Sequence, residues 1–190
     1  MAKPGDLIEN KLAGDRIVFL RTGRETNGEL LELDCIIKPG GQGPPEHYHP
    51  HQEERFIVLA GAFTIRIAGR ETTLGAGEEC AAPAGILHSW KNGGDGEVRM
   101  RMEFRPAGRM EGFLEAIYGL TQDGKLPPRS LSNLLQLGVV LSGFHDADIV
   151  TVVPLPVQKI LGFFGRLLGY KCDYPYPYES PKTTGTAQGA

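Results

Sequence analysis

Two histidines and a glutamate lie close together within residues 41–61, and their side chains are of the types that bind metals. His47 and His49 are two residues apart, and Glu54 follows five residues after His49. In an extended chain, side chains two residues apart leave the same face, so both imidazoles could bind one ion. The odd offset to Glu54 requires a turn, and Pro50 is a residue that breaks a strand. The spacing therefore predicts a strand, a corner and a second strand.

A second segment, residues 77–92, carries a third histidine after a turn that contains glycine and proline. The two segments together resemble the two motifs of the cupin superfamily, G-x5-H-x-H-x4-E-x6-G and G-x5-P-x-G-x2-H-x3-N. Every fixed position of both motifs is filled, by Gly41, His47, His49, Glu54, Gly61, Gly77, Pro83, Gly85, His88 and Asn92. A match of two linked motifs is specific for the fold and the site, and it says little about the substrate.

The resemblance implies a mononuclear centre in which His47, His49, Glu54 and His88 bind one divalent transition metal per chain. Neutral imidazoles with one carboxylate suit Fe, Mn, Ni, Cu or Zn, and the sequence does not distinguish among these ions. The alternative is that the histidines are hydrogen-bonded residues of a barrel that holds no metal. We favour the metal site because all four ligand types occur at the family's spacing.

Three neighbouring residues could line the cavity or support the ligands. Glu53 fits a shorter variant of the first motif, but only Glu54 has the motif's spacing to the following glycine, and adjacent strand residues face opposite ways. His51 lies in the corner and is expected to be a solvated loop residue or a partner of the ligands. Trp90 shares a strand face with His88. It is expected either to line the cavity or to be a core aromatic.

Short segments of alternating apolar residues fill the first part of the chain. Residues 98–105 alternate apolar and charged side chains throughout. Many short strands separated by Gly and Pro predict a sandwich or barrel. The resemblance selects a mainly β fold, the double-stranded β-helix (jelly-roll) barrel of cupins, over residues 15–106. With an amino-terminal arm before it, residues 1–106 would form one domain.

After Pro106 the spacing of apolar residues changes towards the period of a helix. We expect about three C-terminal α-helices within residues 107–172, as an appendage that packs on the barrel or on a partner subunit. Their expected limits are residues 110–119, 131–141 and 156–169, with Ser130 as a cap, Pro156 in a first turn, and Gly119, Gly143 and Gly169 as stops. Residues 173–190 are predicted to be an extended or disordered tail.

The third expected helix has a composition that suits a membrane surface as well as a protein core. From Ile149 to Cys172 the chain contains three basic residues and no acidic one. Residues 156–169 could contact a membrane surface as an amphipathic helix, although they are too short and too charged to span one. We favour the alternative, in which the apolar stripe of this helix packs against the barrel or a second subunit. The stripe consists of Val157, Ile160, Leu161, Phe164 and Leu168.

The composition is that of an ordinary globular protein. With 190 residues, of which 41% are hydrophobic and 23% charged, the chain suits one domain with an appendage. The formal charge of −3 gives no bulk attraction to nucleic acid, and no nucleic-acid partner is expected. We recognise no secretion signal and no transmembrane segment, so a cytoplasmic location is expected. Three widely spaced cysteines do not indicate a disulfide framework.

Two classes of function fit these features. The first is a small-molecule metalloenzyme, most simply dioxygenase-like, whose metal binds an enol, catechol or acid and activates dioxygen; isomerase or decarboxylase chemistry is the near alternative. The resemblance also suggests Glu54 as a catalytic residue that moves protons. The second class is a non-catalytic cupin that binds a small molecule and has a structural metal or none. The resemblance further implies a homodimer formed through sheet edges.

Overall fold

The computed structural model describes residues 1–145 and 154–178, and these contain nine strands followed by three helices. The strands are β1 (Leu7–Glu9), β2 (Arg16–Arg21), β3 (Leu31–Ile37), β4 (Glu53–Ala60), β5 (Phe63–Ile67), β6 (Arg70–Leu74), β7 (Glu79–Ala82), β8 (His88–Asn92) and β9 (Val98–Arg105). The helices are α1 (Met110–Gln122), α2 (Leu131–Phe144) and α3 (Leu155–Leu167).

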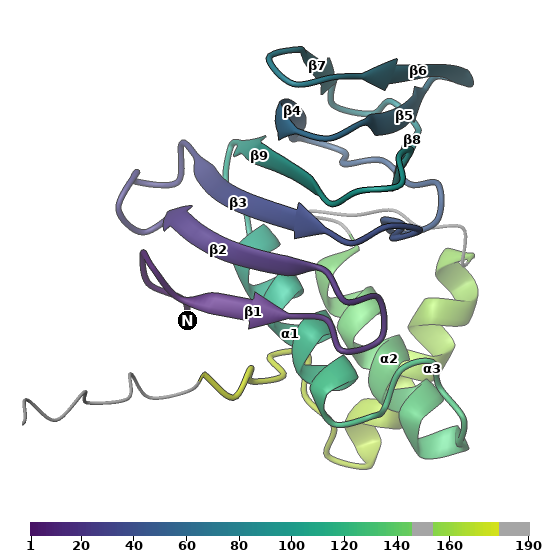
Figure 1. Ribbon diagram of the computed structural model, residues 1–190. Coiled ribbons are helices and arrows are strands. Elements are labelled where there is room, and N and C mark those ends of the chain that lie inside the picture. Colours follow the sequence, from purple (N-terminus) through teal and green to yellow (C-terminus); the bar gives the residue numbers. More distant parts are fainter. Residues whose placement is uncertain (146–153, 179–190) are drawn as a thin grey trace, which may run out of the picture.

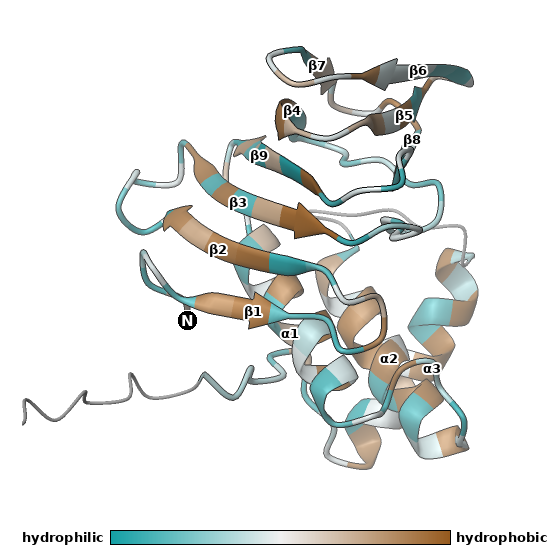
Figure 2. Ribbon diagram, in the orientation of Figure 1, coloured by the Kyte–Doolittle hydropathy of each residue, from teal (hydrophilic) through white to brown (hydrophobic). Residues whose placement is uncertain are grey.

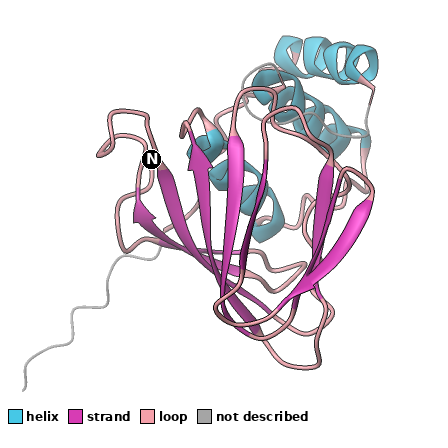
Figure 3. Cartoon of the chain, turned by 90° about the horizontal axis from the view of Figure 1, so that it is seen from above, coloured by secondary structure: helices cyan, strands magenta, loops and turns pink. Residues whose placement is uncertain are grey.

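The strands form two antiparallel sheets that face each other (Figures 1 and 3). The larger sheet has the order β1-β2-β3-β9-β4-β7, and the smaller has the order β6-β5-β8. Strands distant in the sequence are neighbours in both sheets, such as β3 beside β9, which is the crossing pattern of a jelly roll. The predicted mainly β fold followed by three helices is therefore confirmed.

Alternating apolar residues direct one face of each strand into the space between the sheets. In β3, every second residue from Leu31 to Ile37 is buried. Phe56 of β4 and Phe63 of β5 meet from opposite sheets with ring centroids 5.2 Å apart, and both side chains are fully buried. Complete burial of such a side chain contributes roughly 2–3 kcal/mol. Contacts of this kind fix the spacing of the two sheets.

Asn92, the last fixed residue of the second motif, ties the two sheets at a corner. Its amide nitrogen donates to the carbonyl oxygens of Ile37, Lys38 and Gly96 at 2.8–3.0 Å, and its oxygen accepts a hydrogen bond from the Gly94 N–H at 2.9 Å. A buried hydrogen bond contributes about 1 kcal/mol to stability. Asn92 therefore stabilises the bend that follows β3, and it does not contribute a ligand.

Two of the predicted helix ends are wrong, because α1 continues through Gly119 and α2 continues through Gly143. Both glycines lie where another segment approaches closely. A Cβ on Gly119 would lie 2.6 Å from the carbonyl oxygen of Pro175, and a Cβ on Gly143 would lie 2.7 Å from the Cβ of Cys172. A glycine inside a helix costs only about 1 kcal/mol. The close approach, and not a helix end, thus explains both residues.

Other helix signals are confirmed. The Ser130 hydroxyl accepts a hydrogen bond from the Asn133 N–H at 3.2 Å and so caps α2. Pro156 lies in the first turn of α3. Gly169 follows α3 with a positive φ of 87°, a conformation that glycine adopts without strain.

The helices lie beside the β1–β2 side of the larger sheet (Figure 1). α3 packs against α2, and its buried residues are Gln158, Gly162 and Gly165. Most of the apolar stripe that we expected to pack therefore lies on the outside of the molecule. Within residues 1–145 and 154–178, none of the helices has both the length and the apolar character needed to cross a bilayer.

The segment after α3 contacts the rest of the chain through its tyrosines. The Tyr176 hydroxyl accepts a hydrogen bond from the Glu9 N–H at 2.9 Å, and the Tyr178 hydroxyl donates to Glu115 at 2.6 Å. These bonds attach the segment to β1 and α1. The rest of the predicted tail, residues 179–190, lies outside the described residues.

Candidate metal centre

The segment that carries the first two histidines runs alongside β8. His47 and His88 form an isolated antiparallel bridge, in which each backbone N–H donates to the other's carbonyl oxygen at 3.0 and 2.8 Å. The Gly85 N–H donates to the His49 carbonyl oxygen at 2.8 Å. The backbone thus brings the two motifs into register, so that their imidazoles start from neighbouring positions.

Glu54 reaches the same place from the larger sheet. It is the second residue of β4, after the predicted corner, and it pairs with Phe104 of β9 and Ala82 of β7. The alternation of the strand buries Glu54 and exposes Glu53, as the motif spacing required. The carboxylate therefore points between the sheets, towards His88 of the smaller sheet and the segment of His47 and His49 beside it.

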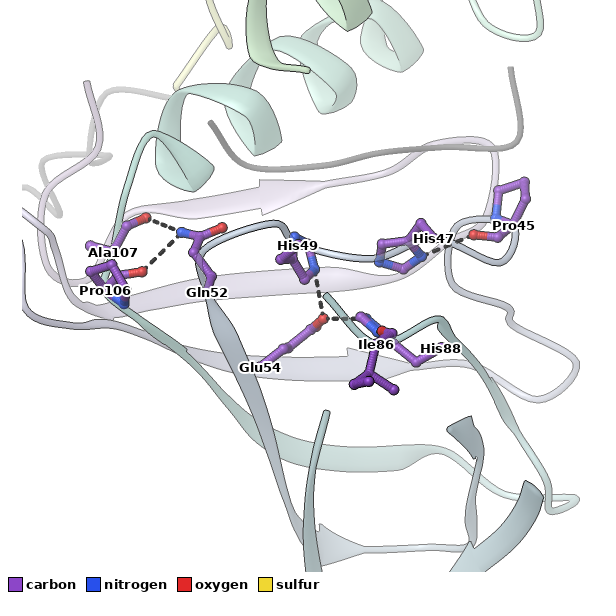
Figure 4. Close-up of polar contacts among 9 residues, drawn as sticks. All are labelled: Pro45, His47, His49, Gln52, Glu54, Ile86, His88, Pro106 and Ala107. Atoms are coloured by element: carbon purple, nitrogen blue, oxygen red, sulfur yellow. Dashed lines mark hydrogen bonds and ion pairs between the residues drawn. The ribbon is translucent and has the colours of Figure 1, made fainter. Parts of the chain in front are cut away.

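The four side chains converge between the sheets (Figure 4). The Glu54 Oε2 atom lies 3.0 Å from His49 Nε2 and 2.9 Å from His88 Nε2. One candidate ligand atom from each of His47, His49, Glu54 and His88 lies within 4.8 Å of the others, and each residue is at most 2% exposed. Ligand atoms around a transition metal stand about 2.0–2.2 Å from the ion. The cluster fits a metal site after a small contraction.

Two of the histidines are already oriented for ligation. His47 Nδ1 lies 2.9 Å from the Pro45 carbonyl oxygen, and His88 Nδ1 lies 2.9 Å from the Ile86 carbonyl oxygen. A carbonyl oxygen only accepts hydrogen bonds, so Nδ1 carries the proton in both rings. In the neutral form, the Nε2 lone pair of each ring then faces the cluster, as a metal ligand requires.

Burial and the glutamate charge set the protonation of the cluster. Burial lowers the pKa of His47 to about 4, so this imidazole is neutral at pH 7. Burial alone would raise the pKa of Glu54, but hydrogen bonds from His49 and His88 outweigh it and hold that pKa well below its usual range. Burial alone would lower the pKa of His88, but its bond to the Glu54 carboxylate raises it. Without a metal, Glu54 and His88 form a buried ion pair at any pH below the raised pKa of His88.

Aromatic rings surround the cluster. Phe104 meets the His49 ring edge-on at a centroid distance of 5.5 Å, and Phe56 meets the His88 ring at 6.4 Å. Such apolar walls keep the local dielectric constant low, which strengthens the attraction between a cation and the Glu54 carboxylate.

The other predicted residues stay outside the cluster. His51 and Glu53 are exposed, and neither belongs to the group of four converging ligands. Trp90 is half-buried, packs on Phe63 at a centroid distance of 5.9 Å and covers Gly43, where a Cβ would lie 2.4 Å from the indole. Trp90 borders a pocket of about 520 Å³, which Arg66, Glu71 and Lys91 also line. That pocket contains none of the four candidate ligands.

Sequence reasoning missed Gln52. This side chain is 1% exposed, and its amide nitrogen donates to the carbonyl oxygens of Pro106 at 2.9 Å and Ala107 at 2.8 Å (Figure 4). The two bonds attach the corner between His49 and Glu54 to the link between β9 and α1. The one clue in the sequence was that Gln52 lies between the predicted ligands His49 and Glu54. A glutamine by itself gives no signal of such a role.

A second pocket, of about 440 Å³, also contains none of the four candidate ligands. It is bounded by β5, β6 and β7, and one of its lining residues, Ile67, pairs directly with His88 in the smaller sheet. Arg70 of β6, which pairs with Ile67 on the strand edge opposite to His88, also lines this pocket. Cys80 forms part of the wall, and burial raises the pKa of its thiol to about 11, so it is protonated at pH 7. Cys80 is therefore not an activated nucleophile.

The family comparison agrees with this geometry. A family model described as "Cupin domain" matches residues 33–103, which run from β3 to β9 and include all four converging side chains. Residues 33–103 therefore form a cupin domain. An RmlC-like cupin structure from Shewanella frigidimarina is 21% identical, with a TM-score of 0.47, over 56% of this chain and 89% of the other.

Two curated relatives of this cupin carry names that mention oxidative chemistry. The protein named "Epoxidase atD" of Aspergillus terreus is 30% identical over 148 residues, which cover 68% of this chain and 45% of the relative. The "Oxidoreductase OpS7" of Beauveria bassiana is 24% identical and covers 82% and 65%. Alignments of this length extend beyond the matched domain into its flanks. The chain spans about half the length of the curated relatives it matches first.

Proposed function

We propose that this cupin is a small-molecule metalloenzyme of the oxidoreductase type, with a dioxygenase-like reaction at a 3-His/1-Glu centre. The observation that supports it most is the convergence of His47, His49, Glu54 and His88 within 4.8 Å inside the jelly roll. A redox-active divalent ion in this site would supply the ability to bind substrate and dioxygen together. The names of the two fungal relatives favour oxidation over isomerisation or decarboxylation.

In this proposal Glu54 serves as a ligand, and the proton-transfer role that the resemblance suggests stays a prediction. In the metal-free cluster, hydrogen bonds from His49 and His88 stabilise its carboxylate and lower its pKa. With an ion bound, the carboxylate would offset the positive charge of that ion. His47 and His88 would hold their Nε2 atoms towards the ion through the carbonyl groups of Pro45 and Ile86.

The pocket beside Ile67 indicates the class of substrate. Its described walls are mainly apolar, and Arg70 is their one charged residue. We infer a small, largely apolar substrate with an anionic group, which Arg70 would bind by hydrogen bonds from its guanidinium. The apolar part would lie along Ile67 towards the cluster.

The test combines metal analysis with substrate screening. Protein prepared with and without oxygen should contain near one transition metal per chain, and oxygen consumption should be screened with apolar carboxylates, enols and catechols. With an anionic substrate, Arg70→Ala should raise KM about tenfold or more, as expected for a lost charged hydrogen bond. Arg66→Ala is the matched control. Arg66 is the exposed residue of β5, on the face opposite to Ile67, and it forms an ion pair with Glu71 at 3.2 Å. Equal effects of both variants would refute the assignment of Arg70.

A second candidate is a non-catalytic cupin with a structural metal. The specific observation in its favour is that all four candidate ligands are at most 2% exposed, which gives a substrate no direct route to the ion. Binding of azide or nitric oxide to the loaded protein, followed by electron paramagnetic resonance or absorption spectroscopy, distinguishes the two. A metal that binds neither molecule would favour the structural role.

The proposal includes two further expectations from the sequence. A homodimer in the cytoplasm remains our expectation for this cupin, and analytical ultracentrifugation of the full chain tests the dimer. A mass equal to one chain at micromolar concentration would contradict it.

A further inference from the structure

Helix α3 carries its apolar side chains on the outside of the molecule. Six large apolar residues of the helix and its end are 44–68% exposed, namely Val157, Ile160, Phe163, Phe164, Leu167 and Leu168. We call them the outer face of α3. Figure 2 shows hydrophobic residues interspersed with hydrophilic ones along this helix. Single exposed apolar residues are ordinary, but six on one helix form a patch of the kind that marks an interaction site.

The opposite side of α3 explains why this orientation is fixed. A Cβ on Gly162 would lie 2.2 Å from the Ser142 hydroxyl, and a Cβ on Gly165 would lie 2.5 Å from Val139. On α2, a Cβ on Gly138 would lie 2.4 Å from Leu161. Small residues on both helices thus allow a close approach that larger side chains would prevent. The helix cannot rotate its outer face inwards without losing this contact.

Two exposed leucines of α2 lie near the end of α3. Gly165 contacts Leu135, whereas Gly162, earlier in α3, contacts Ser142, later in α2, so the two helices run antiparallel. The start of α2 is therefore near the end of α3. Leu131 and Leu134 of that first turn are 69% and 38% exposed.

The charged residues of α3 and of the segment up to residue 172 are all basic. Residues 154–172 contain Lys159, Arg166 and Lys171 and no acidic residue, although the whole chain has a formal charge of −3. Lys159 and Arg166 are exposed, and Arg166 also donates to the Ser142 hydroxyl at 3.1 Å. A second copy docked face to face would bring two sets of these cations together. An anionic surface is complementary to them.

We propose that α3 docks on the surface of a membrane that contains anionic lipids, with its outer face in the interface. Its 13 residues correspond to about 20 Å of helix, which suits a helix lying in the plane of the membrane and not one that crosses it. Phe163 and Phe164 would enter the boundary of the acyl chains, while Lys159 and Lys171 would approach the headgroups. Apolar burial and electrostatic attraction together provide the two contributions that stable surface binding needs.

Vesicle co-sedimentation of the full chain tests this proposal. We expect binding to phosphatidylcholine vesicles that contain phosphatidylserine, weak binding to phosphatidylcholine alone, and release at high salt. Replacing both Phe163 and Phe164 by Ser should weaken partition about tenfold or more. The matched control is Leu59→Ser, because Leu59 is 42% exposed but lies in β4, whose neighbours in the sheet are β9 and β7. Lys159→Gln should weaken partition by about fivefold, from about 1 kcal/mol per charge.

The other outcomes overturn the proposal. Failure to bind the anionic vesicles, or equal binding by the double Phe variant and the wild type, refutes it directly. A dimer that dissociates in the double Phe variant, without vesicle binding by the wild type, assigns the outer face to a second copy instead. Far-UV circular dichroism and thermal unfolding of each variant check that these exposed substitutions leave the fold intact.

Discussion

Replacement of His88 by alanine should remove metal binding without unfolding the protein. His88 is 1% exposed, and its Nε2 lies 2.9 Å from the Glu54 carboxylate. Loss of this partner leaves Glu54 with the bond from His49 at 3.0 Å, so a buried carboxylate remains partly satisfied. Truncating a buried side chain and breaking its ion pair costs about 3–4 kcal/mol in the metal-free protein. A domain of ordinary stability of roughly 5–15 kcal/mol survives that loss.

Denaturant unfolding with and without metal measures both consequences. At a free metal concentration of 100 times Kd, the wild type should gain about 2.7 kcal/mol in free energy of unfolding. His88→Ala should gain almost nothing, because it lacks one of four ligands. His51→Ala is the matched control: His51 lies in the same corner, is exposed and should change neither quantity. A variant without His88 that keeps the full metal-dependent gain would refute the ligand assignment, and global unfolding of that variant would assign His88 to packing.

Three further predictions concern protonation and the supports of the site. The pKa of His47 is about 4 in the folded protein and 6.5 in the unfolded chain. Between pH 4 and pH 6.5 the unfolded chain therefore binds more protons than the folded protein. The free energy of unfolding of the metal-free protein should therefore fall by about 3 kcal/mol from pH 6.5 to pH 4, and a flat profile by urea titration would contradict this. Gln52→Ala leaves the carbonyl groups of Pro106 and Ala107, of which the second is buried, without this donor and should cost about 1–3 kcal/mol. A loss of stability within experimental error would contradict this prediction. Cys80, with a thiol pKa of about 11, should react slowly with iodoacetamide at pH 7 and faster as the pH rises. Mass spectrometry measures the rate of labelling, and fast labelling of Cys80 at pH 7 would contradict this prediction.

The part of the cluster within residues 47–54 could be predicted from the sequence because its geometry is local. His47 and His49 share a face by spacing alone, and the choice of Glu54 over Glu53 followed from strand alternation and the motif. The convergence with His88 could not be derived from periodicity, and it came from the resemblance to cupins. The structure supplies the reason, which is the backbone bridge between His47 and His88.

The parts that the sequence did not predict depend on tertiary neighbours. Gly119 and Gly143 were expected to end helices, but each provides room for a segment more than 25 residues away. The stripe of α3 was expected to pack against the barrel or a second subunit, and within this chain most of it lies on the outside. Instead, the side of α3 that carries Gly162 and Gly165 packs on α2, because these small residues allow the two helices to approach closely. Gln52 gives no signal because its partners are backbone carbonyls distant in sequence.

The most direct test of the metal centre is an anomalous-scattering map of a crystal grown from metal-loaded protein. We expect one peak between the sheets, about 2.0–2.2 Å from Nε2 of His47, His49 and His88 and from a carboxylate oxygen of Glu54. A map with no peak among these four side chains, from protein that contains a stoichiometric metal bound elsewhere, would contradict the account.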